Sequence, residues 1–149
     1  GGFVVDFAMN DKCAAGTGRF IEMMCRILDC SLDEVDEFVR DRRPVEITSM
    51  CTVFAESEII SLLAEGHERG DIALGVVRSI CRRTAYFAQR LSPAGEVFFS
   101  GGLARFEAFR SALEEFIGLP VRTSELSQFA GALGAARIGQ KKRPAASAG

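Results

Sequence analysis

The sequence predicts an α/β domain, and three observations support this class. Short runs rich in β-forming residues alternate along the chain with stretches whose apolar residues recur every three or four positions. At 149 residues, the chain is long enough for one domain with its own core. Its hydrophobic content of 48% and charged content of 26% are ordinary for a globular protein.

The first elements follow from local patterns near the start of the chain. Residues 3–9 form an apolar run with β-forming residues, which predicts a strand. A helix follows, because apolar residues then fall on one helical face: Phe20, Met23, Met24, Ile27 and Leu28. Ser31 with Glu34 forms a capping-box pattern and predicts a second, short helix toward Arg40.

The middle of the chain predicts one extended segment and two helices. Residues 45–54 are expected to be extended, and the helical pattern that begins at Ala55 stops near Gly66. A long helix is expected from about Asp71 to Leu91. Its polar residues form only a narrow stripe, so most of this helix should be buried.

The last third predicts two strands, each followed by a helix. Residues 96–100 and 120–123 are the expected strands, and residues 106–117 and 130–138 the expected helices. This alternation is typical of an α/β domain. We expect residues 1–140 to form the domain and residues 141–149, which are basic and then small and polar, to be a disordered tail.

Charge and composition narrow the function. A formal net charge of −2 argues against sequence-independent binding of nucleic acid. No apolar run approaches the roughly 20 residues that span a bilayer, and no secretory pattern is seen, so no membrane partner is expected. The five cysteines are an odd number, which favours free thiols and a cytoplasmic protein. Because the chain opens Gly1-Gly2 rather than with Met, we expect a piece of a longer protein.

The stretch NDKCAAGTGRF places Cys13 before a glycine-rich turn formed by Gly16, Thr17 and Gly18. Glycines allow a close approach of the backbone to a ligand, and the helix start behind them favours negative charge. The spacing matches neither a P-loop nor a dinucleotide fingerprint. A tight strand-to-helix connection with an incidental cysteine is therefore the alternative.

Cys51 also stands directly ahead of a predicted helix, so it and Cys13 would converge at one end of a sheet. Two thiolates do not satisfy a four-iron cluster, which needs four, unless a two-fold axis supplies a second pair. Cys25 and Cys30 are the alternative source within one chain. Together with Cys81, they are otherwise interpreted as buried small hydrophobes.

Four stretches carry a resemblance to a known family. FAMNDKCAAGTGRFIE (7–22) and CTVFAESEIISLLAEG (51–66) closely resemble the ATPase activators of 2-hydroxyacyl-CoA dehydratases. The related ATPase subunits of benzoyl-CoA reductase, of the BadF/BadG/BcrA/BcrD type, share these stretches. FSGGLA (99–104) and QFAGALGAA (128–136) look like later motifs of the same family.

The resemblance implies the second half of an actin, hexokinase and heat-shock type (ribonuclease H-like) ATPase fold, with a mixed sheet flanked by helices. It implies that Cys13 and Cys51 ligate one 4Fe-4S cluster shared across a homodimer. Gly101 and Gly102 would lie against the adenosine of bound ATP or ADP. Gly16, Thr17 and Gly18 would lie near the phosphates.

The implied activity is ATP-dependent transfer of one electron to a dehydratase or reductase component that carries its own iron-sulfur clusters. A ferredoxin or flavodoxin would be the upstream donor. The family's two phosphate loops, which serve Mg²⁺ and the γ-phosphate, are absent from this sequence, so hydrolysis by the chain alone is not expected. A cluster-free sugar or metabolite kinase relative and an inert dimerisation unit are the alternatives. No catalytic base is assigned, because Glu56 and Glu58 are expected to form a solvated helix start.

Overall fold

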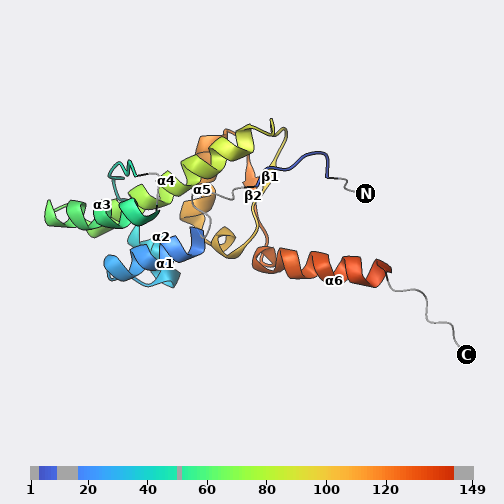
Figure 1. Cartoon of the computed structure of the whole chain (residues 1–149), viewed down its shortest axis with the longest axis horizontal. Coiled ribbons are helices and arrows are strands. Elements are labelled where there is room, and N and C mark those ends of the chain that lie inside the picture. Colours follow the sequence, from blue (N-terminus) through green and yellow to red (C-terminus); the bar gives the residue numbers. More distant parts are fainter. Residues whose placement is uncertain (1–3, 10–16, 50–51, 143–149) are drawn as a thin grey trace, which may run out of the picture.

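The computed structural model describes residues 4–9, 17–49 and 52–142. The described residues form six α-helices, three short 3-10 turns and two strands (Figure 1). In chain order they are α1 (Thr17–Ile27), η1 (Leu32–Glu34), α2 (Val35–Phe38), α3 (Thr52–Ala64), α4 (Arg69–Gln89), β1 (Val97–Phe98), η2 (Gly102–Arg105), α5 (Glu107–Ile117), β2 (Val121–Arg122), η3 (Ser127–Phe129) and α6 (Ala130–Lys142).

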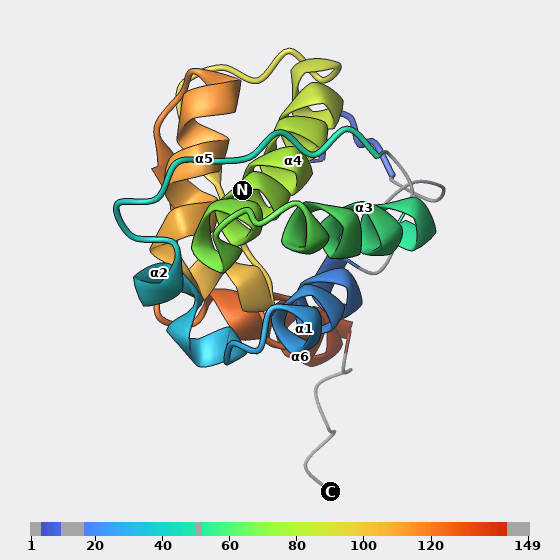
Figure 2. The same ribbon diagram turned by 90° about the vertical axis from the view of Figure 1, so that its left-hand side faces the viewer.

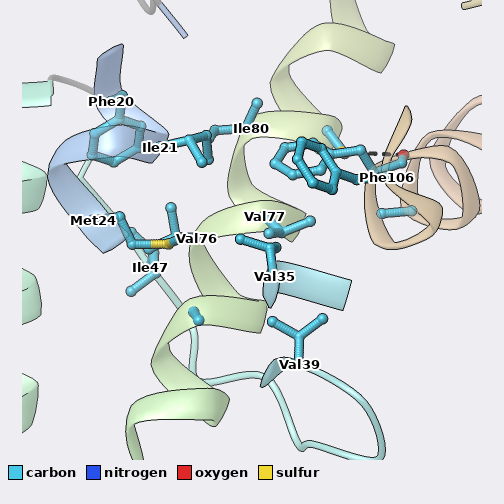
Figure 3. Close-up of a cluster of buried hydrophobic side chains, with 14 of the residues drawn as sticks. Phe20, Ile21, Met24, Val35, Val39, Ile47, Val76, Val77, Ile80 and Phe106 are labelled. Atoms are coloured by element: carbon cyan, nitrogen blue, oxygen red, sulfur yellow. Dashed lines mark hydrogen bonds between the residues drawn. The ribbon is translucent and has the colours of Figure 1, made fainter. Parts of the chain in front are cut away.

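Helix α4 is the centre of the core. Its buried residues include Ile72, Val76 and Val77, which have no exposed surface, and they meet side chains of α1, α2, α3 and α5. Figure 3 shows α1 side chains such as Met24 facing this helix. Fully burying an aliphatic side chain stabilises a fold by roughly 1.5–3 kcal/mol. The periodicity that predicted a largely buried helix here is therefore confirmed.

The two strands pair in parallel, with Val97 opposite Val121. The pairing is closed by a bond from the Val97 amide to the Pro120 carbonyl at 2.9 Å and one from the Phe99 amide to the Arg122 carbonyl at 2.7 Å. Parallel neighbours need a crossover, and α5 supplies it. The β-α-β unit predicted for this part of the chain is confirmed.

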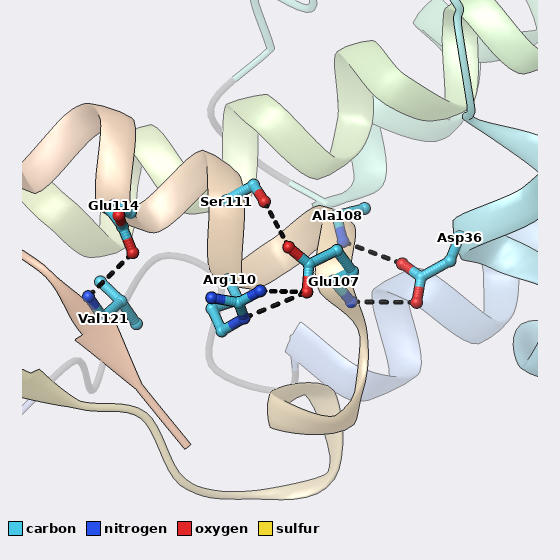
Figure 4. Close-up of polar contacts among 7 residues, drawn as sticks. All are labelled: Asp36, Glu107, Ala108, Arg110, Ser111, Glu114 and Val121. Atoms are coloured by element: carbon cyan, nitrogen blue, oxygen red, sulfur yellow. Dashed lines mark hydrogen bonds and ion pairs between the residues drawn. The ribbon is translucent and has the colours of Figure 1, made fainter.

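The helix α5 begins with help from a distant carboxylate. Asp36, on α2, accepts hydrogen bonds from the amides of Glu107 and Ala108 at 2.9 and 2.8 Å (Figure 4). These amides belong to the first turn, where helical N–H groups have no partner within the helix. Phe106 holds the N-cap position and makes no side-chain cap bond, so Asp36 replaces the local cap.

Two predicted extended segments are not strands. Residues 4–9 have no regular structure and are exposed, and among the described residues no strand pairs with them. Residues 45–49 lie across α4 without joining a sheet, and Thr52–Phe54, expected to be extended, open α3 instead. A strand requires a hydrogen-bonding neighbour, and an apolar run alone does not distinguish a strand from a helix.

The remaining elements differ from the predictions mainly at their ends. The Ser31 hydroxyl accepts a bond from the Asp33 amide at 3.3 Å and caps a 3-10 turn, and the short helix then ends at Phe38. Helix α6 runs to Lys142, beyond Ile138, and extends away from the other elements (Figure 1). No described helix is both long and apolar enough to cross a bilayer.

Candidate functional site

A hollow of about 320 Å³ brings the start of α1 next to the glycine pair that follows β1. Gly18, in the first turn of α1, and Gly102, which opens η2, both line it. Its other lining residues are Glu22, Leu32, Leu103, Arg105, Phe106 and Gln128. The structure thus brings together two glycine motifs that are far apart in the sequence.

The glycines leave room for a ligand at this hollow. A Cβ atom added at Gly18 or Gly102 would meet no other atom within 4 Å. Gly101 has φ +103°, a conformation that residues with a side chain rarely adopt. Its amide donates to the carbonyl of Ser127 at 3.0 Å, which holds the glycine turn against η3. The backbone at Gly101 and Gly102 is therefore both held in place and accessible.

The lining of the hollow combines apolar and charged groups. Leu32, Leu103 and Phe106 provide apolar surface, while Glu22 and Arg105 carry opposite charges. The Arg105 guanidinium lies 4.5 Å from the centre of the Phe106 ring and pairs with Asp33. Apolar walls with a few polar groups suit a base and ribose better than a bare phosphate.

A second hollow of about 300 Å³ also borders the glycine pair. Its walls are mainly apolar and include Ile80, Phe99 and Leu113. Gly101 and Gly102 both line this second hollow, and Gly102 also lines the hollow beside α1. The glycine turn is therefore open to ligand on more than one side.

Cys13, Gly16 and Cys51 lie outside the described residues. The helices that follow them are described: α1 begins at Thr17 and α3 at Thr52. The two helices contact each other, and their N-terminal ends lie on the same side of the molecule (Figures 1 and 2). Both cysteine motifs therefore lead into neighbouring helix starts.

The loop before α3 is tied to that helix by Glu58. One carboxylate oxygen accepts bonds from the Thr48 amide at 2.9 Å and the Thr48 hydroxyl at 2.8 Å, and the other accepts from the Ser49 amide at 2.9 Å. Burial raises the pKa of Glu58, but these hydrogen bonds outweigh it and lower the pKa to about 2. The expectation that Glu58 is merely solvated is wrong, whereas Glu56 is exposed.

The other cysteines pack as apolar side chains. Cys25 and Cys81 are buried, and the Cys81 thiol donates to the Phe109 carbonyl at 3.5 Å. Burial raises the pKa of Cys25, and it raises the pKa values of Cys30 and Cys81 to about 12. A thiol with a raised pKa is a poor ligand and nucleophile. Within the described ranges, no three His, Cys, Asp or Glu side chains form a metal-binding group.

Sequence reasoning missed several residues at the hollow. Arg105 directly follows the FSGGLA motif and Gln128 opens the QFAGALGAA motif, so both stood beside or within a quoted stretch, but Leu32 comes from a distant segment with no local signal. His67 lies away from the hollow and is exposed, with its Nε2 atom 3.6 Å from a Glu65 oxygen.

A parallel β-α-β unit with a glycine-lined hollow after its first strand is typical of the nucleotide-binding domains of α/β proteins. Residues 1–139 match the model of the BadF/BadG/BcrA/BcrD ATPase family, and the chain belongs to that family. This confirms the resemblance carried by the two cysteine motifs.

Relatives of known role support the same assignment. The chain is 44% identical over 142 residues to the (R)-2-hydroxyglutaryl-CoA dehydratase activating ATPase of Acidaminococcus fermentans, covering 95% of this chain and 55% of that protein. The crystal structure of the A. fermentans dehydratase component A matches with a TM-score of 0.86 at 45% identity, covering 93% of this chain and 54% of that one.

A second solved structure, the activator of the 2-hydroxyisocaproyl-CoA dehydratase from Clostridium difficile with bound ADPNP, matches with a TM-score of 0.82 at 35% identity. That match covers 97% of this chain and 57% of the activator. The fold is therefore that of the activator ATPases, and the predicted fold class is confirmed. The chain spans about half the length of the curated relatives it matches.

Proposed function

We propose that the protein acts as an ATP-dependent one-electron activator of a 2-hydroxyacyl-CoA dehydratase or a benzoyl-CoA reductase-type enzyme. The observation that carries this proposal is the 44% identity to a dehydratase-activating ATPase along 95% of the chain. Nucleotide would bind at the hollow beside Gly18 and Gly102. A 4Fe-4S cluster would be held by Cys13 and Cys51 of two copies of the chain.

The available donors fit a shared cluster. A cubane needs four thiolates, and Cys13 and Cys51 provide two per chain. The remaining cysteines, Cys25, Cys30 and Cys81, have raised pKa values and belong to or border the core. A two-fold axis supplies the missing pair, because it places the same two residues of a second copy opposite the first. When bound, such a cluster supplies reversible one-electron transfer.

The helices α1 and α3 would favour thiolate at both ligand positions. The amides of a helix's first turn carry partial positive charge, and each cysteine precedes one of these helices within a few residues. The exposed Arg19 adds a full positive charge to the first turn of α1. The chain would therefore stabilise negative charge at both proposed ligand positions.

Nucleotide would be recognised by the open backbone at Gly18 and Gly102 and by the apolar walls of the hollow. Leu32, Leu103 and Phe106 exclude water from one face of a base, while Arg105 can donate hydrogen bonds. Mg²⁺ and the γ-phosphate would be held by other parts of the whole protein. A ferredoxin or flavodoxin would reduce the activator, and the acceptor would be a dehydratase or reductase component with its own iron-sulfur clusters.

Anaerobic reconstitution with iron and sulfide tests the cluster. We expect about two irons per chain in a dimer, since four irons would be shared by two copies. Cys13→Ala and Cys51→Ala should each lose the iron and Cys81→Ala should keep it. Retention of iron in both of the first two variants, or four irons per monomer, would overturn the shared site.

Thermal stabilisation by ADP tests the nucleotide site. ADP at millimolar concentration should raise the melting temperature of wild-type protein, because a ligand that binds only the folded state stabilises it. Gly102→Val should abolish this shift while Gly139→Val, on α6, should keep it. An iron-free protein that phosphorylates a small hydroxyl compound would establish the kinase-like alternative. A folded protein that takes up neither iron nor nucleotide would favour an inert dimerisation unit.

A further inference from the structure

We propose that Glu58 is a positioning residue for Cys51, because it ties the loop before this cysteine to the helix after it. This inference rests on the proposed function, in which Cys51 is a cluster ligand. Glu58 is not itself a ligand of the proposed cluster; it would help to hold Cys51, one of the two proposed ligands, in position.

Glu58 joins the loop before α3 to that helix, and we call this set of hydrogen bonds from Thr48 and Ser49 to Glu58 the clamp. Its two carboxylate oxygens accept three hydrogen bonds, at 2.8 to 2.9 Å, from consecutive residues of the loop, Thr48 and Ser49. The carboxylate belongs to the second turn of α3, whereas the donors precede that helix. Hydrogen bonds to a charged acceptor are shorter and stronger than those between neutral groups.

The clamp acts on a very short piece of chain. Cys51 follows Ser49 by two residues in the sequence and directly precedes Thr52, where α3 begins. The hydrogen bonds to Glu58 therefore hold the chain at Ser49, one residue before Met50 and two before the proposed ligand.

A second contact holds the same loop from the core. The Arg83 guanidinium, on α4, donates to the Ser49 carbonyl at 3.2 Å. Ser49 is thus bonded through its amide to α3 and through its carbonyl to α4. The segment that leads into Cys51 is fixed relative to two packed helices.

The charge of Glu58 suits this role and not proton transfer. Its three bonds lower the pKa to about 2, so the group stays an ionised acceptor at working pH. Glu56, two residues earlier on the same helix, is exposed and takes no part in these bonds. The two glutamates therefore differ in their contacts to the loop, while sharing charge, size and helix.

The test compares Glu58→Gln with Glu56→Gln in anaerobically reconstituted protein. A Gln amide has one acceptor oxygen and one donor NH₂, so it cannot accept all three bonds. We expect Glu58→Gln to lose iron to a chelator roughly ten-fold faster than wild type, at the low end of the roughly 10–100-fold loss of metal affinity that follows when groups orienting a ligand are removed. Glu56→Gln should match wild type.

Two further measurements separate positioning from general stability. Hydrogen exchange of the Thr48 and Ser49 amides should accelerate in iron-free Glu58→Gln but not in Glu56→Gln. Leu113→Ala, which destabilises the core on α5, should leave the iron-loss rate unchanged below its melting temperature. Thr48→Val removes one of the three donors and should give a smaller acceleration of iron loss. It also tests the clamp if Glu58→Gln does not fold.

The outcomes are distinguishable. Equal iron loss from wild type and a folded Glu58→Gln would overturn the inference and leave the proposed function standing. Equal acceleration in Leu113→Ala would also overturn it, because general stability would then explain the effect. If wild type binds no iron, the proposed function fails and this inference with it. The exchange rates of the two amides would then report only that Glu58 anchors the loop.

Discussion

The helical body built by α1 to α5 and the outlying helix α6 use their apolar side chains differently. In the body, Phe109 and Val76 are almost wholly buried, at 1% and 0% exposure. On α6, Leu133 and Ile138 are 50% and 57% exposed, and this helix chiefly contacts the η3 turn before it. The contacts that stabilise the fold therefore lie in the body, and α6 depends on its own backbone hydrogen bonds.

The intrinsic helix propensity of the α6 residues does not make up for the tertiary contacts that this helix lacks. The helix has 13 residues and contains three glycines, Gly131, Gly134 and Gly139. A glycine in a helix costs about 1 kcal/mol relative to alanine, and isolated helices of roughly 12–15 residues are marginal in water. The four predictions below test this contrast, from the largest expected effect to the smallest.

The largest effect is expected at Phe109. Phe109→Ala should lower the free energy of unfolding by about 3–5 kcal/mol, since it removes a buried aromatic side chain and leaves a cavity. The matched control is Phe129→Ala before α6, where the side chain is 51% exposed and the loss should stay within about 0.5 kcal/mol. Urea unfolding measures both. Equal losses would refute the contrast.

A smaller effect on stability is expected for substitution of two glycines by alanine, and its sign should differ between them. At Gly75 a Cβ atom would overlap the carbonyl oxygen of Val45, so Gly75→Ala should cost about 1–3 kcal/mol by overpacking. At Gly131 it would meet nothing within 4 Å, so Gly131→Ala should leave stability unchanged or raise it by up to about 1 kcal/mol. Thermal unfolding followed by circular dichroism compares the stabilities of the two variants with that of wild type. Stabilisation by Gly75→Ala would contradict the close packing of Gly75 against Val45.

Acid should destabilise the body and not α6. Hydrogen bonds from Arg110 lower the pKa of Glu107, those from Arg78 lower the pKa of Glu115, and the pKa of Glu58 falls from 4.5 to about 2 against the effect of burial. A lowered folded-state pKa favours folding above the ordinary pKa, and that contribution is lost as pH falls toward the folded-state value. Helix α6 contains no carboxylate side chain.

The acid prediction is measured as the free energy of unfolding against pH. It should be level from pH 7 to about 5 and fall between about 4.5 and 2 for wild type. Glu58→Gln should be less stable at neutral pH but should show a shallower fall in that window. An equally steep fall would mean that Glu58 has no lowered pKa.

The smallest effect is expected on α6 itself. Leu133→Ser should change the free energy of unfolding by less than about 0.5 kcal/mol, because half of the side chain already faces solvent. Amide exchange on α6 should also be faster than on α4 in the same sample. A large loss on Leu133→Ser would show that this face is covered in solution.

Much of the fold was predictable because its signals are local. The long buried helix was expected at residues 71–91 and is α4, Arg69–Gln89. The β-α-β unit around α5 was also expected. These elements follow from apolar periodicity, which is decided by residues three or four positions apart. The errors fall on residues 4–9 and on the start of α3, where an apolar run lacks the neighbour that a strand requires.

At the candidate site, too, the features with local sequence signals were predicted and those that depend on distant residues were not. The cysteine and glycine motifs were visible as short stretches, and they are sufficient to place the chain in its ATPase family. Glu58 was seen but misjudged, since its donors, Thr48 and Ser49, lie outside its own helix. Asp36 was not recognised at all, because the start of α5 that it caps is a distant segment.

The sequence by itself determined the helix periods, the family and the identity of the two cysteines proposed as ligands, because each depends on residues close together in the chain. Only the tertiary structure decided that Gly18 meets Gly102 at one hollow and that α1 and α3 contact each other with their N-terminal ends on the same side of the molecule. The physical reason is that such meetings are set by how helices pack around α4. That packing depends on the summed burial of many side chains, and no single stretch of sequence encodes it.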